Sequence, residues 1–485
     1  MSLIGVDVGT SGIKAAAYTE DGRRLATARH EIVAHHEHPG EWEIDVNDSL
    51  TAFNASIRVL TTDPAVRRDP PTALGVSASG REVFPVAADG TPLGPCLASG
   101  DLRGEAQARV VAGLLPRDQW VTLAGHVPGR MDPVSRALWW LDTQPSIAAH
   151  ARWFLNWHDF YVLRLTGRAV ADRSGAAGWA AFDLESGGWA PERLAATRFD
   201  PKWLPHIQSS GTPIDTIRPR AARDLGLPGR TLIVTGAFDT IAAALGTGAV
   251  DRGLVALASG TWHTLTTAVD AWGDDAILDL GSLIPHPGPT GLGLIAANPN
   301  GTSVTDWARR FLRLSVRDIE RGLRDAGSGP SPVTADVTLT PVGEWASEPW
   351  AGGSLARLTL ATSGVDILRS IMEGVAAEFA RTIGALRRRN VCPTLVRASG
   401  GGARSSWWLQ LEADLADLPI EVTTVDEAGT YGAAMLAGIG ADIYSSPSAA
   451  IADLVRVRRR FEPQPARAAL YRPVLARRER RAADS

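Results

Sequence analysis

The sequence predicts an α/β fold built from two similar halves, and three observations lead to this prediction. The chain has 485 residues, more than one ordinary hydrophobic core holds, so two large domains are expected. An apolar strand, a Gly-Thr turn and a β-rich strand occupy residues 3–19, and the same pattern recurs at 253–269. Elsewhere, apolar strands alternate with amphipathic helices. We therefore expect domains over residues 1–247 and 248–485, which face each other across a cleft.

The composition is that of a soluble globular protein, with 45% hydrophobic residues, 21% charged residues and a formal net charge of −4. This balance gives no reason to expect nucleic acid or an anionic membrane as a partner. The first apolar run is too short for a signal peptide, and no apolar run is long enough to span a bilayer. Cys96 and Cys392 are the only cysteines, so we expect neither disulfides nor a cysteine metal site, and a reducing, cytoplasmic location.

The first hairpin carries a carboxylate where an apolar side chain is expected. Residues 3–8 form an apolar strand except for Asp7, and the Gly-Thr-Ser-Gly turn 9–12 leads into the second strand. Because an unpaired buried charge is costly, Asp7 requires a partner such as a metal ion or a cation. The backbone N–H groups of the turn would form an anion-binding nest beside it. The stretch suits a metal-bound phosphate, and the alternative is a hairpin whose Asp7 only caps the turn.

A second carboxylate ends another core strand, residues 231–239. It belongs to Asp239, and a helix of small residues follows it as far as Gly248. A carboxylate at a strand end, near the Gly260-Thr261 turn of the second hairpin, is where an α/β enzyme places its chemistry. The alternative is that Asp239 serves as the N-cap of the helix.

A glycine-rich turn at residues 399–405 lies between a strand and a helix. Such a turn places backbone N–H groups at a helix N-terminus, which suits an anion or a nucleotide, although many glycine turns only connect elements. The only lysines, Lys14 and Lys202, do not follow a glycine, so the chain has no Walker A sequence. A nucleotide would have to be bound by another arrangement.

Other segments are expected to be structural. Three histidines within residues 35–40 have the spacing of neither a helix face nor a zinc finger, so a solvated loop is expected. Helices are expected over residues 152–165 and in the arginine-rich tail after Arg456.

Together, these residues resemble the FGGY carbohydrate kinases, a family that includes xylulokinase, ribulokinase, gluconate kinase and glycerol kinase. The resemblance extends nearly end to end and implies a duplicated actin/hexokinase-type, ribonuclease H-like fold with two domains around a central cleft. Six motifs occur in the family's order and with its gaps. They are Asp7-Val-Gly-Thr10 with Lys14, Asp101-Leu-Arg103, Leu165-Thr-Gly167 with Phe182-Asp183 and Trp189, Gly236-Ala-Phe-Asp239 with Gly246, Ser259-Gly-Thr261, and Gly400-Gly-Gly-Ala-Arg-Ser405 with Gln410, Ala413-Asp414 and Gly432-Ala-Ala434.

The resemblance implies ATP-dependent phosphorylation of a sugar hydroxyl, a reaction that depends on positioning and charge neutralisation. Asp239 is expected to be the general base, and Asp7 is expected to hold Mg²⁺ through water. The expected phosphate and adenosine contacts are Asp7, Gly9, Thr10, Ser11, Lys14, Gly260, Thr261, Gly301, Gly401, Gly402, Arg404 and Ser405. The expected sugar contacts are Arg81, Glu82, Asp101 and Asp239.

Three departures from the family fall on the sugar side. Xylulokinases usually carry Gly-Gln-Met-His-Gly where this chain has Ala78-Ser-Gly-Arg-Glu82, and their common Trp before Asp101 is replaced by Ser99. Thr240 follows the base where Asn or Gln is frequent. Glycerol kinases place an Arg-Glu pair in this region, so glycerol or erythritol stays open, as do ribulose, fuculose and gluconate. The length and the remaining motifs favour a ketopentose such as xylulose.

Functions of other classes are also compatible with such a fold. Actin-like ATPases and chaperones hydrolyse ATP without a sugar acceptor, and residues 70–190, which resemble a sugar-side subdomain, argue against that function. A catalytically silent sugar sensor is disfavoured because both Asp7 and Asp239 are present. The expected ligands are ATP, Mg²⁺ and a small sugar or polyol, and a homodimer is compatible with the resemblance, because dimers are common among relatives.

Overall fold

The computed structural model describes the chain except residues 39, 271–279, 326, 328, 340–351 and 484–485. The described residues form two compact units, each of them discontinuous in the sequence. Unit 1 comprises Met1–Asp251, Ala268–Leu294 and Glu427–Val455, and unit 2 comprises Arg252–Thr267, Ile295–Asp426 and Arg456–Ser485. Unit 1 therefore takes one segment from near the C-terminus. The division at residue 247 stays a prediction about the duplicated halves of the sequence.

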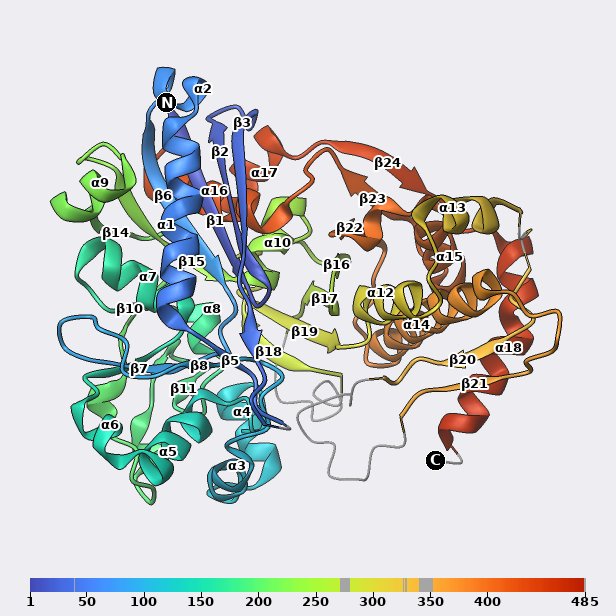
Figure 1. The fold of residues 1–485 in the computed structure, drawn as a ribbon, viewed down its shortest axis with the longest axis horizontal. Coiled ribbons are helices and arrows are strands. Elements are labelled where there is room, and N and C mark those ends of the chain that lie inside the picture. Colours follow the sequence, from blue (N-terminus) through green and yellow to red (C-terminus); the bar gives the residue numbers. More distant parts are fainter. Residues whose placement is uncertain (39, 271–279, 326, 328, 340–351, 484–485) are drawn as a thin grey trace. The chain divides into compact units, whose positions relative to one another are not determined.

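A six-stranded sheet in the order β14-β15-β6-β1-β2-β3 forms the centre of unit 1 (Figure 1). β1 and β6 pair in parallel, as do β6 and β15, whereas the β1–β2, β2–β3 and β14–β15 pairs are antiparallel. The strands are β1 (Ser2–Gly9), β2 (Gly12–Thr19), β3 (Arg24–Glu31), β6 (Pro71–Ala78), β14 (Pro213–Thr216) and β15 (Leu232–Phe238). β1 and β6 are buried on both faces, which explains their nearly continuous apolar sequence.

Helices pack on this sheet. α1 (Val46–Thr62) contacts β2 and β3, and α16 (Ala428–Gly440) contacts β1, β6 and α10 (Asp239–Thr247). A Cβ atom at Gly432 would lie 1.8 Å from the carbonyl oxygen of Ala242. Only glycine therefore permits the close approach of α10 and α16, which explains the small-residue composition of both helices.

The remaining elements of unit 1 are shorter, and many of them surround a second core that contains Trp120, Trp179 and Trp203. They are β4 (Ala34–His35), β5 (Glu43–Ile44), α2 (Pro64–Arg68), β7 (Phe84–Val86), β8 (Cys96–Leu97), α3 (Glu105–Ala112), α4 (Arg117–Ala124), α5 (Pro133–Thr143), α6 (Pro145–His150), β9 (Trp153–Leu155), α7 (Trp157–Thr166), β10 (Val170–Asp172), α8 (Arg173–Ala176), β11 (Phe182–Asp183), β12 (Gly188–Trp189), η1 (Pro191–Leu194), η2 (Pro201–Trp203), β13 (His206–Gln208), α9 (Pro219–Leu225), β18 (Ser282–Pro285) and α17 (Pro447–Leu454).

Unit 2 contains β16, β22, β23 and β24 of a seven-stranded sheet with the order β18-β19-β17-β16-β22-β23-β24. Its strands other than β18 are β16 (Leu254–Ser259), β17 (His263–Ala268), β19 (Leu292–Asn298), β22 (Leu395–Ser399), β23 (Ile420–Thr423) and β24 (Val457–Phe461). β16 pairs antiparallel with β17 and parallel with β22, just as β1 pairs with β2 and β6. The parallel β22–β23 pair and the antiparallel β23–β24 pair repeat the β6–β15 and β14–β15 pairs. The predicted duplicated α/β fold is therefore confirmed.

The other elements of unit 2 are mostly helical. They are α12 (Thr302–Phe311), α13 (Val316–Asp325), β20 (Thr334–Asp336), β21 (Ser354–Ala356), α14 (Gly364–Arg388), η3 (Gly402–Arg404), α15 (Ser406–Ala416) and α18 (Pro465–Ala483). α14 begins with a capping box in which Ser363 and Asp366 satisfy each other's backbone N–H groups. Within the described part of the chain, no helix combines the length and apolar character needed to cross a bilayer.

Two expected helices differ from the structure. Trp153–Leu155 forms β9, which pairs with β7, and α7 begins only after Asn156, whose side chain accepts a 3.0 Å hydrogen bond from the backbone N–H of Asp159. The tail after Arg456 first adds the edge strand β24 to the sheet, and α18 follows it. In both places a tertiary pairing decides the conformation of a short segment.

Candidate functional site

Asp7 lies in the centre of the unit 1 sheet, opposite Lys14 of β2 and Ser77 of β6. The Ser77 hydroxyl donates a 3.4 Å hydrogen bond to its carboxylate. Burial raises the pKa of Asp7 to about 6, although the charge of Lys14 opposes the shift, and the charge of Glu427 adds to it. The predicted carboxylate within the apolar strand is therefore present and half-buried, and it has only weak compensation from the protein.

The beginning of α16 approaches this carboxylate closely. A Cβ atom at Gly429 would lie 2.7 Å from the carboxylate carbon of Asp7, so any side chain at this position would collide with Asp7. Glu427, directly before the helix, accepts a 2.7 Å hydrogen bond from the Lys14 ammonium group. Sequence reasoning missed both residues.

Asp239 lies at the junction of β15 and α10, also in unit 1. Phe238 is the N-cap of α10 and Asp239 is its first residue, so the N-cap interpretation of Asp239 is wrong. Its carboxylate accepts a 2.6 Å hydrogen bond from the backbone N–H of Thr240. Burial, together with the negative charges of Asp7 and Glu82, raises the pKa of Asp239 to about 7. A carboxylate with this pKa both accepts and releases a proton near neutral pH.

The turn of the first hairpin is tight and accessible. Gly9 pairs with Gly12, so Thr10 and Ser11 are the two central residues of the turn. Thr10 is half-buried and Ser11 is exposed. Their hydroxyl groups and the surrounding backbone N–H groups are therefore available to a ligand at the end of the strand that carries Asp7.

The predicted sugar contacts Asp101 and Glu82 differ in how many of their carboxylate oxygens already accept hydrogen bonds from the protein. Asp101 is buried and accepts hydrogen bonds from the backbone N–H groups of Trp42 and Arg103, at 2.8 Å each, and from the Arg103 guanidinium. Glu82 is also buried, but only one of its oxygens accepts a hydrogen bond, from Ser99 at 2.5 Å. The other oxygen, Oε2, has no hydrogen-bond partner among the described residues.

Ser99 is thus the structural partner of Glu82, at the position where the family commonly has tryptophan. The Arg81 guanidinium donates hydrogen bonds to the Gly178 carbonyl at 3.3 Å and to the Ser282 hydroxyl at 3.2 Å. Arg136, which sequence reasoning missed, is fully buried and donates to the carbonyl oxygens of Leu97 and Ala98. It holds the loop that carries Ser99.

In unit 2, the second hairpin is fixed by the start of α12. The backbone N–H of Thr302 donates a 2.7 Å hydrogen bond to the carbonyl oxygen of Gly260. The Ser303 hydroxyl donates to the carbonyl oxygen of Thr261 at 3.0 Å. A Cβ atom at Gly301 would lie 2.6 Å from the Gly260 oxygen, so glycine is required for this approach. The structure therefore brings the predicted Gly260, Thr261 and Gly301 together.

The glycine-rich turn lies against the same hairpin. Gly402 packs on Ser259, since a Cβ atom there would lie 2.0 Å from the Ser259 hydroxyl oxygen. Gly401 differs, because a Cβ atom at this position would meet nothing within 4 Å. Ser405 caps α15 by accepting a 3.3 Å hydrogen bond from the backbone N–H of Trp408, and Arg404 is exposed. The turn is therefore closely packed on one side and open on the other.

Comparisons with known proteins identify the family. Residues 2–246 match the model for the FGGY family of carbohydrate kinases, N-terminal domain, and residues 257–441 match the C-terminal domain. The chain belongs to the FGGY family of carbohydrate kinases. Its fold, with two duplicated α/β halves, is therefore of the actin/hexokinase type, and members of the family use ATP as the phosphate donor. A sugar acceptor is thereby favoured over an actin-like ATPase without one.

Curated relatives of the kinase include several ketose kinases. The L-fuculokinase of Salmonella typhi is 26% identical over 484 residues, which cover 95% of this chain and 97% of the relative. The xylulose kinase of Escherichia coli K12 is 25% identical over 441 residues, with 90% of each chain covered.

Solved structures of kinases show the same fold. The xylulose kinase of Lactobacillus acidophilus superposes with a TM-score of 0.87 at 23% identity, over 99% of this chain and 98% of the other. The glycerol kinase of Plasmodium falciparum superposes with a TM-score of 0.82 at 18% identity, over 98% of each chain. The fold is thus shared by enzymes whose names indicate different substrates.

The residues of the kinase fit a magnesium nucleotide. Among the described residues, no group of three or more His, Cys, Asp or Glu side chains is arranged to hold a metal ion. A fully protein-built metal cage is therefore not found in that part of the chain. A single carboxylate with weak compensation, such as Asp7, suits Mg²⁺, which keeps several waters and takes its other ligands from phosphate. The open hairpin turn beside Asp7 leaves space for such phosphate groups.

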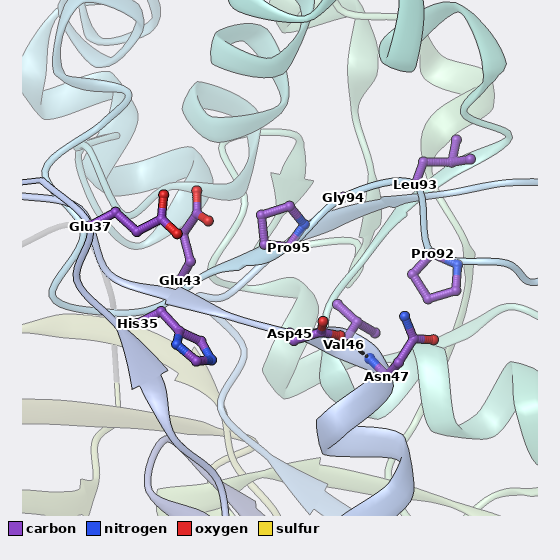
Figure 2. A pocket seen from close by; sticks show the side chains of 10 residues that line it. All are labelled: His35, Glu37, Glu43, Asp45, Val46, Asn47, Pro92, Leu93, Gly94 and Pro95. Atoms are coloured by element: carbon purple, nitrogen blue, oxygen red, sulfur yellow. Dashed lines mark hydrogen bonds between the residues drawn. The ribbon is translucent and has the colours of Figure 1, made fainter.

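A large pocket of unit 1 lies on other elements. Its volume is about 520 Å³, and Figure 2 shows the residues that line it around β5 and the start of α1. They are His35, Glu37, Glu43, Asp45, Val46, Asn47, Pro92, Leu93, Gly94 and Pro95. None of the predicted site residues is among them, so this pocket lies apart from the predicted site. The cluster of histidines contributes only His35 to it.

Proposed function

We propose that this kinase transfers the γ-phosphoryl group of ATP, with Mg²⁺, to a hydroxyl of a ketopentose such as xylulose, and that Asp239 is the general base. The observation that carries the proposal is the Asp239 carboxylate, whose pKa burial and nearby negative charge raise to about 7. A general base is most effective when its pKa lies near the working pH. The ketose kinases among the curated relatives support a ketose acceptor.

In the proposed mechanism, each polar group has a limited role. The Asp239 carboxylate takes the proton of the attacking hydroxyl while the sugar oxygen bonds to the γ-phosphorus and the bond to the bridging oxygen of ADP breaks. Asp7 would hold Mg²⁺ through water, and the ion would neutralise negative charge on the phosphates. Thr10, Ser11 and Lys14 would contact the phosphates from unit 1.

Unit 2 would bind the rest of the nucleotide. The N–H groups of the Gly260-Thr261 turn would contact phosphate, and Gly301, Gly401, Gly402, Arg404 and Ser405 would line the adenosine side. The open side of Gly401 supports this assignment, because a ligand fits where a Cβ atom would meet nothing within 4 Å. A cytoplasmic location and a homodimer also stay predictions.

On the sugar side, Arg81, Glu82 and Asp101 would contact hydroxyl groups of the substrate. Glu82 is the strongest of these candidates, because its buried Oε2 has no partner among the described residues and an added hydroxyl would supply one. Asp101 already accepts five hydrogen bonds from Trp42 and Arg103, and it would also position the loop. The Arg81–Glu82 pair keeps a polyol such as glycerol or erythritol as the second candidate.

A substrate panel tests the proposal. ADP release is coupled to an indicator reaction and measured with D-xylulose, L-xylulose, D-ribulose, L-ribulose, L-fuculose, gluconate, glycerol and erythritol. The proposal predicts the highest kcat/KM for a ketopentose. Activity on glycerol or erythritol with none on any ketose would contradict the ketopentose assignment but keep the kinase. ATP hydrolysis at one rate with every compound would contradict phosphorylation of all of them.

A further inference from the structure

The strand that presents Asp239 has an interruption just before this residue. β15 pairs with β6 through Val234 and again from Ala237, and the register shifts between these two residues. A Cβ atom at Gly236 would lie 1.6 Å from the carbonyl oxygen of Val76, so β15 lies directly against β6 here. The interruption removes regular ladder partners from buried backbone N–H groups, and such groups require other acceptors.

Two buried side chains supply these acceptors. His158 Nε2 accepts a 3.1 Å hydrogen bond from the backbone N–H of Gly236. The Ser174 hydroxyl accepts a 2.8 Å hydrogen bond from the backbone N–H of Phe238. His158 belongs to α7 and Ser174 to α8, and both helices contact β15 (Figure 1). The last residues before Asp239 are therefore held by side chains from two neighbouring helices.

The ring orientation of His158 is fixed from its other side. Because an amide N–H can only donate, Nε2 must be unprotonated, and the ring proton lies on Nδ1. Nδ1 lies 3.0 Å from a carboxylate oxygen of Asp159, to which it donates, and 3.9 Å from Asp172. Asp172 also accepts a hydrogen bond from the Ser174 hydroxyl. His158 and Ser174, which hold the strand, are therefore both oriented by the neighbouring carboxylates of Asp159 and Asp172.

We propose that His158 is a positioning residue, which together with Ser174 holds the backbone before Asp239 and thereby aims the Asp239 carboxylate at the substrate hydroxyl. The proposal rests on the proposed role of Asp239 as general base. Among the described residues, Asp239 receives a hydrogen bond only from its neighbour Thr240, so its position follows that of the strand. Misplacement of a catalytic group by 1 Å costs about 10²-fold in rate.

Two substitutions of His158 separate the two sides of its ring. His158→Asn keeps an amide near the position of Nδ1, so it retains the contact with Asp159 and loses the acceptor for Gly236. His158→Gln places its amide oxygen near the position of Nε2 and retains that acceptor. With the most active sugar of the panel, we expect His158→Asn to lower kcat by about 10- to 10²-fold without raising the KM for ATP, and His158→Gln to restore most of the loss.

The matched control is a second buried histidine. His126 lies 3.1 Å from Asp132 and is equally buried, but its hydrogen bonds go to Asp132 and to the carbonyl oxygen of Ala124. His126→Asn should lower the melting temperature without changing kcat of the folded fraction. If His158→Asn behaves in the same way, the histidine is merely structural and the proposal is overturned. If His158→Asn fails to fold, Ser174→Ala, which deletes one hydroxyl group, carries the same test.

Two further measurements separate this proposal from the proposed function. If His158 acts through Asp239, adding His158→Asn to Asp239→Asn should cause no further loss of kcat, whereas two multiplying losses would overturn the proposal. If Asp239→Asn alone keeps normal turnover, the proposed base is wrong. Hydrogen exchange of the peptide 232–240 requires no sugar, and it should be faster in His158→Asn than in the wild type. Unchanged exchange would overturn the proposal even if the substrate were unknown.

Discussion

Asp239→Asn should stabilise the fold, and this gain should grow as the pH rises. Folding raises the pKa of Asp239 from 3.8 to about 7. Between these values the folded chain holds a proton that the unfolded chain has released, so the stability of the wild type falls as the pH rises through this window. With these two pKa values, the raised pKa of Asp239 lowers the free energy of unfolding of the wild type by under about 2 kcal/mol at pH 5 and by about 4 kcal/mol at pH 8. Asparagine is neutral throughout and avoids the cost.

The assay is urea denaturation of wild type and Asp239→Asn at pH 5 and pH 8, without ligands. We expect the variant to gain about 2–3 kcal/mol more at pH 8 than at pH 5. Asp183→Asn is the matched control, because hydrogen bonds from Ser186 and the Arg193 ion pair outweigh burial and lower the pKa of Asp183. Its stability contribution is present above pH 4 and is lost on acidification, so Asp183→Asn should show no gain at either pH. An equal effect of Asp239→Asn at both pH values would refute the reasoning.

Three other predictions concern ligand contacts. Lys14→Met should change the free energy of unfolding by only about 0–1 kcal/mol, because the ion pair of Lys14 with Glu427 is partly exposed. The same substitution should raise the KM for ATP. An unchanged KM would contradict a contact between Lys14 and phosphate. Gly301→Ala should weaken ATP binding and lower the melting temperature. Gly401→Ala should weaken ATP binding and leave the melting temperature unchanged. Calorimetry measures ATP binding, and thermal denaturation measures the melting temperature. Arg81→Ala should raise the KM for the sugar much more than the KM for ATP, and equal increases would contradict its sugar-side role.

The sequence allowed the duplicated fold to be predicted because the signals are local. Each hairpin combines an apolar strand with a Gly-Thr turn, and the structure places both in sheets whose strand orders correspond, apart from the additional strand β18. Asp7 could be singled out because a carboxylate in an apolar strand is costly to bury, and Asp239 because it stands at the end of a core strand. The N-cap alternative for Asp239 required the structure, since one residue decides whether Phe238 or Asp239 caps α10.

Contacts between segments far apart in the sequence could not be predicted in the same way. Glu427 lies 413 residues from its partner Lys14, and no local pattern connects them. The support of Gly236 by His158 depends on a register shift in β15, which the apolar sequence of the strand does not reveal. The sequence predicts helices for the segments that form β9 and β24. Both predictions are wrong because the conformation of these segments depends on pairing with β7 and β23 rather than on their own residues.

The central claim is that a sugar hydroxyl loses its proton to Asp239. The most direct test measures kcat for wild type and Asp239→Asn at pH 8 with the most active sugar of the panel, together with calorimetric affinities for sugar and ATP. The account predicts a fall in kcat of about 10²- to 10⁴-fold with both affinities largely kept. Near-normal kcat in a fully folded preparation of the variant would contradict it.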